Sequence, residues 1–410
     1  MESEIRLMFR KDAAEWNHIL AHAYPDFTGP DAVKWMEESI EKRDWGLFYG
    51  AWRDEKLAGG MRVYPLLMNV RHKKIEADGL GFVAVDMLHR KQKVAKDLVM
   101  FFLKNARKSG KNMASLYPFR VDFYKKMGFG YGTRLYRLAP RPDAFRYFTD
   151  AGKVEIGDKE KDFPEMLECY NRFIGSTNGM CEMINGTLSR LAEKSRFIVY
   201  RNNNRIEGFM FYRFVPVGDK LVYRNNMQVF YFIHENPSAF KALSTFIAAQ
   251  SDQIERILLQ SHTPDIALAF SDPTNGHSET FHSEQLETTV TATAMMYRII
   301  DFKRLIKESD GMQFGTGDLS VLFKIRDTFM PHNNGETAVV FSKGNAEISK
   351  TKHCDIEISI DISELATLFT GAATLGQLYS MGLAEVSNPE RIHLLEKIIQ
   401  TERPVCLTTF

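Results

Sequence analysis

A basic loop between an apolar strand and a helix has the composition of a phosphate-binding site. Residues 81–96 read GFVAVDMLHRKQKVAK, so a predicted strand ends near Val85 and a predicted helix begins near Val94. Such a junction presents backbone N–H groups without helical partners and the positive end of the helix dipole, which suit a pyrophosphate. Between His89 and Lys126, lysine and arginine greatly outnumber acidic residues. A solvated basic helix face explains the same charges, so the loop alone does not identify a site.

A tyrosine motif follows further along the chain, in the segment Phe123-Tyr124-Lys125-Lys126-Met127-Gly128-Phe129. It places Tyr124 in a short predicted helix, and the Gly-Phe pair opens a strand. A phenol with its ordinary pKa of about 10 keeps its proton at neutral pH and can act as a proton donor. Such a tyrosine usually packs in the core, so the motif by itself indicates little.

The elements that must position these motifs form a mixed α/β region. Apolar residues recur at helical spacing within 12–43, with an interruption at 24–31. An alternating pattern then predicts an antiparallel meander across 47–85. The remaining predicted elements are a helix at 90–109 closed by Gly110, a strand within MASLYPF, a helix at 121–127 and a strand at 129–139. Together they predict one domain that ends near residue 145.

Part of this pattern recurs in the middle of the chain. The hairpin sequence LFYGAWRDEKLAGGM aligns with IVYRNNNRIEGFM, so that Asp54 falls on Asn203 and Gly59 falls on Gly208. Two unrelated hairpins could coincide in this way. A second copy of the fold, at 146–295, is the interpretation that we prefer.

A third region begins at MMYRIIDFKRLI and predicts a small α+β domain over 296–410. Its strands are TAVVFSK and CDIEISIDI, its helices lie at 363–370, around LGQLYSMG and at 388–400, and RPVCLTTF forms a terminal strand. We therefore expect three domains, 1–145, 146–295 and 296–410, because 410 residues exceed what one hydrophobic core supports.

Composition and charge exclude several classes of protein. Hydrophobic residues are 44% and charged residues 26%, which is typical of a soluble globular protein, and the net charge of +1 favours neither nucleic acid nor an anionic membrane. The N-terminus has acids and no apolar run, so we expect no signal peptide, and no stretch is apolar enough to span a membrane. The four cysteines are scattered without a C-x-x-C pair, which argues against a metal site and fits thiols in the cytoplasm.

Taken together, the loop and the tyrosine motif resemble the GNAT acetyltransferase superfamily. Val83-Ala84-Val85 matches the strand that pairs with the pantetheine arm of coenzyme A. Arg90-x-x-Lys93-x-Ala95 takes the place of the Arg/Gln-x-x-Gly-x-Gly/Ala loop, and Phe123-Tyr124-x-x-x-Gly-Phe is similar to the late tyrosine motif. With a second GNAT-like region, a small C-terminal domain and a terminal phenylalanine, the whole chain resembles the Eis (enhanced intracellular survival) family.

This resemblance implies tandem GNAT-like mixed sheets, the first catalytic and the second degenerate, followed by a domain with the sterol-carrier-protein fold. It also implies an N-acetyltransferase that uses acetyl-CoA and no metal, and a hexameric assembly. The coenzyme is expected between Val83–Val85, the loop Lys91–Lys96 and the opposite strand. The expected coenzyme contacts are Val83, Ala84, Val85, Lys91, Gln92, Lys93, Val94, Ala95, Lys96, Phe119 and Arg120.

The resemblance assigns the proton donor to Tyr124 and the proton acceptor to the C-terminal carboxylate of Phe410. An α-carboxyl with a pKa of about 3.5 is a poor base, so burial, a bridging water or an electrostatic role must assist it. An apolar C-terminus docked only for stability is the alternative for Phe410.

The acceptor amine is expected to enter past the acidic and aromatic segment 22–55, with Asp26, Trp35 and Phe82 as substrate contacts. Acids interleaved with aromatic rings suit a cationic amine such as an aminoglycoside, a polyamine or a lysine side chain. A charged, solvated helix face explains the same acids equally well.

One active site per chain is expected, because the second copy has neither motif. The segment equivalent to the basic loop is AFKALS at 239–244, and no Tyr-x-x-x-Gly-Phe follows it.

The first copy departs from the family at one position, where Lys93 replaces the loop glycine. Helical φ and ψ at Lys93, with the lysine side chain as an extra phosphate partner, would preserve the loop. Two other functions stay open: a catalytically silent GNAT-fold binding protein, and a lipid-binding protein acting through its C-terminal domain.

Overall fold

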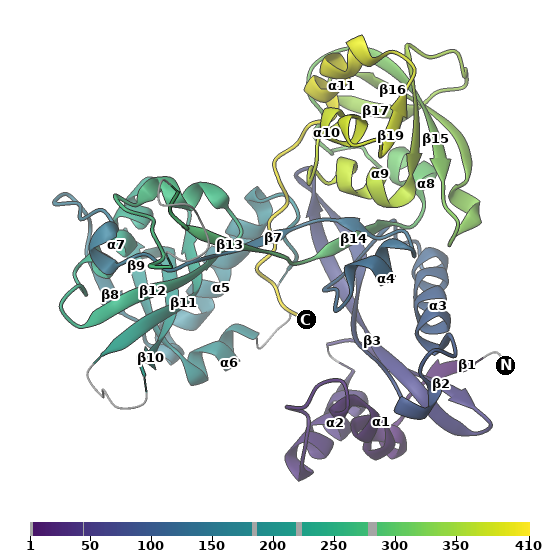
Figure 1. The fold of residues 1–410 in the computed structure, drawn as a ribbon. Coiled ribbons are helices and arrows are strands. Elements are labelled where there is room, and N and C mark those ends of the chain that lie inside the picture. The colour runs from purple at the N-terminus through teal and green to yellow at the C-terminus, as the bar shows by residue number, and fades with distance from the viewer. Residues whose placement is uncertain (1–2, 44, 183–186, 219–223, 278–284) are drawn as a thin grey trace. The chain divides into compact units, whose positions relative to one another are not determined.

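The structure is a computed structural model that describes residues 3–43, 45–182, 187–218, 224–277 and 285–410. The chain forms two compact units, and Figure 1 labels most of their elements. The first unit consists of Met1–Gly132, Met295–Pro404 and Thr409–Phe410, and the second of Thr133–Ala294 and Val405–Thr408. Each unit is described by itself below.

The N-terminal part of the first unit is built on a seven-stranded mixed sheet with the order β1-β2-β3-β4-β5-β14-β6. Its strands are β1 (Glu4–Leu7), β2 (Leu47–Arg53), β3 (Lys56–Val70), β4 (Lys73–Val85), β5 (Met113–Leu116), β6 (Gly130–Tyr131) and β14 (Met296–Ile299). Its helices are α1 (Ala13–Ala21), α2 (Pro30–Lys42), α3 (Val94–Lys108) and α4 (Val121–Lys125), with 3-10 turns at Arg10–Asp12 and Met87–His89. The predicted helices within 12–43 and the antiparallel meander β2-β3-β4 are thereby confirmed.

Helix α3 forms because its apolar residues recur at helical spacing and cover one face of the sheet. Leu98, Phe102 and Ala106 along this face are fully buried in the core, together with Phe129. The helix ends at Lys108, and Gly110 follows with a positive φ of 83°, which glycine adopts without steric cost.

Strands β4 and β5 run parallel for a short distance and then diverge. Their pairing covers only Ala77–Leu80 on β4, whereas β4 stays paired with β3 as far as Val85. A bulge accompanies the divergence: the register of β3 and β4 shifts after Gly60, and Phe82 has a φ of 48°. The last residues of β4 therefore keep one edge free of β5.

The strand predicted at 129–139 is wrong as a single element. The structure divides it into β6 in the first sheet and β7 (Arg134–Leu138) in the second, while β14 lies between β5 and β6. Strand pairing depends on partners distant in the chain, so local alternation could not reveal this exchange. The division at 145 and 295 into separately folding domains stays a prediction.

The second unit has its own seven-stranded sheet, with the order β13-β7-β12-β11-β10-β9-β8. Its remaining strands are β8 (Val154–Ile156), β9 (Arg196–Asn202), β10 (Arg205–Pro216), β11 (Asn225–His234), β12 (Ile254–Ser261) and β13 (Thr289–Thr293). Its helices are α5 (Lys159–Ser176), α6 (Thr187–Lys194) and α7 (Pro237–Ala248), with 3-10 turns at Pro142–Ala144 and Pro264–Ala269.

The predicted repeat is visible in the backbone of the two hairpins. The turn between β2 and β3 has φ values of 47° and 62° at Asp54 and Glu55, and that between β9 and β10 has 49° and 62° at Asn203 and Asn204. Two consecutive positive φ values are the signature of a tight hairpin turn with the twist of its strands. Both hairpins therefore use the same turn, as expected of two copies of one fold.

The C-terminal part of the first unit is an α+β domain on a five-stranded sheet, β17-β16-β15-β18-β19. Its strands are β15 (Leu319–Arg326), β16 (Gly335–Ser342), β17 (Asn345–Ile348), β18 (Ile356–Asp361) and β19 (Ala384–Val386). Its helices are α8 (Phe302–Lys307), α9 (Ile362–Phe369), α10 (Leu375–Ser380) and α11 (Ile392–Ile399), with 3-10 turns at Pro331–Asn333 and Pro389–Arg391.

The predicted terminal strand, RPVCLTTF, is wrong: residues 401–410 form no strand. Val405 and Leu407 instead make single hydrogen bonds to a backbone carbonyl and to side chains. Val405 N donates to Asn178 O at 2.9 Å, and Leu407 O accepts from the Tyr231 hydroxyl at 2.9 Å.

Candidate active site

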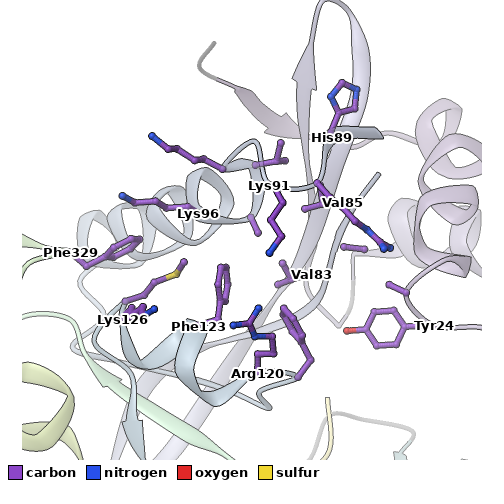
Figure 2. Close-up of a pocket in the computed structure, with 18 of the residues that line it drawn as sticks. Tyr24, Val83, Val85, His89, Lys91, Lys96, Arg120, Phe123, Lys126 and Phe329 are labelled. Atoms are coloured by element: carbon purple, nitrogen blue, oxygen red, sulfur yellow. The ribbon is translucent and has the colours of Figure 1, made fainter. Parts of the chain in front are cut away.

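A cavity of about 960 Å³ opens in the first unit between the end of β4 and the start of α3 (Figure 2). It is lined by most of the predicted coenzyme contacts, namely Val83, Ala84, Val85, Lys91, Lys93, Val94, Ala95, Lys96, Phe119 and Arg120. Several other predicted site residues in the described part of the chain lie outside this lining: Asp26, Trp35, Phe82, Gln92 and Tyr124. Phe410 also lies outside it.

The loop before α3 has a left-handed backbone where the family has glycine. Lys91 has a φ of 63° and Lys93 a φ of 69°, and Lys93 is the N-cap of α3 without a side-chain capping bond. The expectation of helical φ and ψ at Lys93 is therefore wrong. A residue other than glycine in this conformation costs about 1 kcal/mol, so the surrounding contacts must impose it.

The buried guanidinium of Arg53 supplies such contacts. It donates to the Gln92 carbonyl oxygen at 2.9 Å and to Gln92 Oε1 at 3.2 Å, and it pairs with Asp97 at 3.3 Å. Gln92 Nε2 in turn donates to the Leu88 carbonyl at 2.9 Å. Gln92 therefore holds the loop together rather than facing the cavity.

The N-terminus of α3 offers donors to an anion. The first bond within the helix runs from Asp97 N to Lys93 O at 3.0 Å, so the N–H groups at the preceding positions have no helical partner. Lys91 extends toward the centre of the cavity in Figure 2, on the side of Val83. Backbone donors and a lysine side chain together suit a pyrophosphate.

The opposite wall of the cavity is formed by residues that come after β5 in the sequence. Phe119 and Arg120 lie in the connection between β5 and α4, and not on a strand as expected. Phe119 is 64% exposed, and the Arg120 guanidinium pairs with Asp122. The hydrogen bond and charge of Asp122 raise the pKa of Arg120, which stays a cation at the cavity wall.

Tyr124 lies in the core beneath this wall and is only 2% exposed. Its ring packs against Phe119 and Phe123, with centroids 5.6 and 5.1 Å away, and both of these residues line the cavity. Burial, with a smaller contribution from Tyr24, raises the pKa of Tyr124 well above its ordinary value. The phenol thus keeps its proton over the whole physiological range.

Four aromatic rings gather at the bulge of β4. The ring of Phe82 lies 5.6 Å from Tyr24, 5.2 Å from Phe27 and 6.2 Å from Trp35. Tyr24 alone of these four lines the cavity, and Figure 2 shows its hydroxyl turned toward Val83. The structure thus brings Trp35 and Phe82 together.

Three of the acids near the expected acceptor entrance form ion pairs with neighbouring cations. Arg10 pairs with Glu37 and Glu41, each at 3.0 Å, and Lys42 pairs with Glu38 at 3.4 Å. These three glutamates fit the solvated helix face better than an acceptor site. Asp26, which precedes Phe27 in the sequence, is exposed, and Asp44 lies outside the described residues.

The last residue packs on the first sheet, below the divergence of β4 and β5. The ring of Phe410 lies 5.2 Å from Tyr64 on β3 and 5.5 Å from Tyr117, which follows β5. Gly79 on β4 leaves room for it, because a Cβ there would lie 2.7 Å from the Phe410 ring.

The equivalent helix of the second unit is closed to an anion. Asn236 caps α7, and its Oδ1 accepts from Ala239 N at 2.9 Å, while Pro237 at the first helical position has no N–H. The predicted equivalent of the basic loop, 239–244, lies inside this helix.

Sequence reasoning missed the contribution of the C-terminal domain to the cavity. Thr328 and Phe329 line it, although more than two hundred residues separate them from the loop at Lys93. No local motif signals such a contact. Within the described residues, no group of three or more His, Cys, Asp or Glu side chains could hold a metal ion. None of the helices described is sufficiently long and apolar for a membrane crossing.

Comparisons with known proteins agree with this geometry. The family model of an acetyltransferase (GNAT) domain matches residues 4–132, a second model of such a domain matches 183–299, and the model of a sterol carrier protein domain matches 312–407. No curated protein matches the sequence.

Several solved structures have the same fold over the whole chain. A GCN5-related N-acetyltransferase from Anabaena variabilis is 16% identical with a TM-score of 0.83, and both chains are covered completely. Eis1 from Mycobacterium abscessus is 17% identical with a TM-score of 0.77 and the same coverage. A probable N-acyltransferase from Enterococcus faecalis is 16% identical with a TM-score of 0.81, covering 100% of this chain and 99% of that one. Two acetyltransferase domains followed by a sterol carrier protein domain make the chain a GNAT acetyltransferase with an Eis-like fold.

Proposed function

We propose that this chain transfers the acetyl group of acetyl-CoA directly to an amine of a cationic acceptor, in one active site in its first domain. The observation that carries the proposal is the cavity at the start of α3. It combines a free edge of β4, uncapped backbone N–H groups and the cations Lys91 and Arg120.

These donors fit the coenzyme. A strand edge can pair with the amides of a pantetheine arm, and a helix N-terminus beside lysine and arginine suits a pyrophosphate. Val83 and Val85 would hold the pantetheine arm, and residues 92–95 would hold the pyrophosphate. The bound coenzyme supplies the acetyl group; the residues of the chain orient it and exclude water.

Two groups would handle protons. Tyr124 is the proton donor, and its raised pKa keeps the phenol protonated until the thiolate departs. The carboxylate of Phe410, the last residue of the sequence, is the proton acceptor. Its support is the position of the ring between Tyr64 and Tyr117, against Gly79 on β4 and next to the place where β4 and β5 separate.

The acceptor is an aminoglycoside, a polyamine or a lysine-like amine that reaches the cavity past Asp26, Trp35 and Phe82. A cation is attracted to the faces of aromatic rings, and the cluster around Phe82 offers several of them. Asp26 is the exposed carboxylate nearest to this cluster in the sequence.

Two alternatives receive less support. The protein would be catalytically silent if Lys93, in place of the loop glycine, prevented phosphate binding. Lys93 adopts a left-handed backbone like that of a glycine, so the loop remains open to phosphate. Lipid binding by the C-terminal domain finds no suitable cavity among those described: the cavity among α9, α10 and α11 holds about 100 Å³, and the cavity of about 620 Å³ beside β18 is lined by charged residues such as Lys324, Arg326 and Glu385. Pockets for drug-sized ligands measure about 300–1,000 Å³.

We also propose that the protein assembles as a hexamer and is located in the cytoplasm. All four cysteines lie in the described part of the chain, and none forms a disulfide. Analytical ultracentrifugation of the purified protein tests the assembly: a sedimenting species of one or two chains would contradict it.

Isothermal titration with acetyl-CoA is the primary test, followed by mass spectrometry of amine products from a panel of aminoglycosides, polyamines and lysine peptides. We expect saturable binding and an acetylated product. Binding without any product would favour the silent alternative, and the absence of binding would refute the proposal.

A further inference from the structure

The cavity has a wall that the first domain does not make. Thr328 and Phe329, in the loop after β15 of the C-terminal domain, line it together with Lys96 of α3 and Lys126 at the end of α4. The ammonium of Lys96 lies 5.8 Å from the centre of the Phe329 ring. Phe329 is 6% exposed and packs into the core of the first domain.

The loop that carries Phe329 is held rigidly. Asp327 accepts from Phe329 N at 3.2 Å and from Met330 N at 2.9 Å, and its other oxygen pairs with the fully buried Arg298 at 2.6 Å. Arg298 belongs to β14, which lies between β5 and β6 in the first sheet. The loop is therefore positioned against the cavity by a buried ion pair, and a rigid wall can select a ligand by shape and charge.

The order of groups in coenzyme A determines which part reaches this wall. Pantetheine, pyrophosphate and 3′-phosphoadenosine follow one another in a line. With pantetheine along Val83–Val85 and pyrophosphate at the N-terminus of α3, the adenosine end continues away from Tyr24. Figure 2 shows Lys126 and Phe329 at the end of the cavity opposite Tyr24.

Charge at this end suits an additional phosphate. Lys126 borders a second cavity of about 620 Å³, whose lining includes Lys125, Lys324 and Arg326. Its acids Asp122, Asp361, Glu364 and Glu385 balance these cations, and Lys125 pairs with Glu364 at 2.7 Å and Arg326 with Asp361 at 3.3 Å. The charge available to a phosphate at this end therefore comes from Lys96 and Lys126, which line the first cavity. Lys96 and Lys126 are both exposed, so a phosphate can reach them from the first cavity.

We propose that the sterol carrier protein domain forms part of the coenzyme site, and that Lys96, Lys126 and the Thr328–Phe329 wall bind the 3′-phosphoadenosine end. This inference rests on the proposed function and extends it. The C-terminal domain then serves coenzyme selection, because it favours carriers with a 3′-phosphate over carriers without one.

The test compares the binding of coenzyme A and 3′-dephospho-coenzyme A by isothermal titration to the full chain. We expect coenzyme A to bind at least about tenfold more tightly, the effect of one charge-assisted hydrogen bond. Lys126→Met and Lys96→Met should each weaken the binding of coenzyme A but hardly change that of the dephospho form. Lys104→Met removes the same charge from the exposed face of α3 outside both cavities and should leave the ratio unchanged.

The role of the C-terminal domain is tested at Thr328, which is exposed and so tolerates a change of charge. Thr328→Glu should lower the preference for coenzyme A, and Thr328→Arg should raise it. Gln313→Glu, an exposed position of the same domain outside the cavity, is the matched control. Differential scanning fluorimetry confirms that each variant is folded.

The outcomes separate this inference from the proposed function. Equal affinity for the two ligands, or a ratio that neither lysine variant nor Thr328 variant alters, would overturn the 3′-phosphoadenosine site and leave the acetyltransferase intact. If neither ligand binds at all, the proposed function itself fails.

Discussion

The aromatic ring of Phe410 lies against that of Tyr64, with centroids 5.2 Å apart, and it fills the space that Gly79 leaves on β4. A side chain at residue 79 would meet the Phe410 ring at 2.7 Å. The last residue of the chain is thus docked on the sheet that carries the candidate coenzyme site, although the segment before it, 405–408, belongs to the second unit.

This docking makes the C-terminal carboxylate testable. If it accepts a proton, extending the chain by a short tag or deleting Phe410 should lower the acetylation rate by about 10²-fold, the usual scale for acid–base catalysis. The Gly79→Ala variant should have a similar effect, because its methyl group displaces the ring without changing the chain length. The measurement is activity per folded molecule, with an N-terminal tag as the control; full activity in the extended chain would remove the carboxylate from the mechanism.

Tyr124→Phe removes the phenolic proton and keeps the buried ring. We expect the acetylation rate to fall by about 10²-fold while the affinity for acetyl-CoA stays the same, because a general acid acts only in the transition state. Tyr131→Phe, on the exposed edge of β6, is the matched control. Tyr24→Phe should be measured beside them, since the Tyr24 hydroxyl faces the cavity. A loss confined to Tyr24→Phe would transfer the role of proton donor to that residue.

The variants Lys93→Gly and Lys93→Ala distinguish the effect of the backbone conformation of the loop from the effect of the lysine charge. Both variants remove the ammonium group, but only alanine keeps the strain of a φ of 69°. The glycine variant should be more stable than the alanine variant by about 1 kcal/mol. If the lysine side chain contacts the coenzyme, both should bind acetyl-CoA about tenfold more weakly, as for one charge-assisted bond. Unchanged affinity in both would make Lys93 a backbone element only.

The carboxyl group of Asp78 on β4 should give the stability of the protein a distinct pH dependence. Burial raises its pKa to about 6, above the unfolded value of about 3.9, so the native state binds more protons between these values. Asp78 therefore opposes folding increasingly as the pH rises from 4 to 6, by as much as about 3 kcal/mol above pH 6.

Asp78→Asn removes this ionisation, so the variant should unfold at a higher temperature than the natural chain at pH 8 and at a similar temperature near pH 4. Thermal unfolding at the two pH values provides the measurement, with the exposed Asp310→Asn as the control. A difference between Asp78→Asn and the natural chain that is independent of pH would contradict the raised pKa.

The sequence by itself determined the local elements and the order of the motifs. The turn residues Asp54 and Asn203 lie at equivalent places of two hairpins because turn chemistry is local. The amphipathic pattern of α3 and the Tyr124 motif likewise follow from spacing along a few turns of chain. These features were sufficient to predict the family resemblance and most residues that line the cavity.

Only the tertiary structure decided which segments meet. The free edge at the end of β4 depends on where β5 stops pairing with it. The placement of β7 in the second sheet and of β14 in the first depends on partner strands that are distant in the chain. The cavity wall at Phe329 depends on the buried ion pair of Arg298 and Asp327. The left-handed backbone of Lys93 is stabilised by Arg53 through Gln92, a contact across some forty residues. Local propensity cannot encode such choices, because each depends on the packing of residues that are remote in sequence.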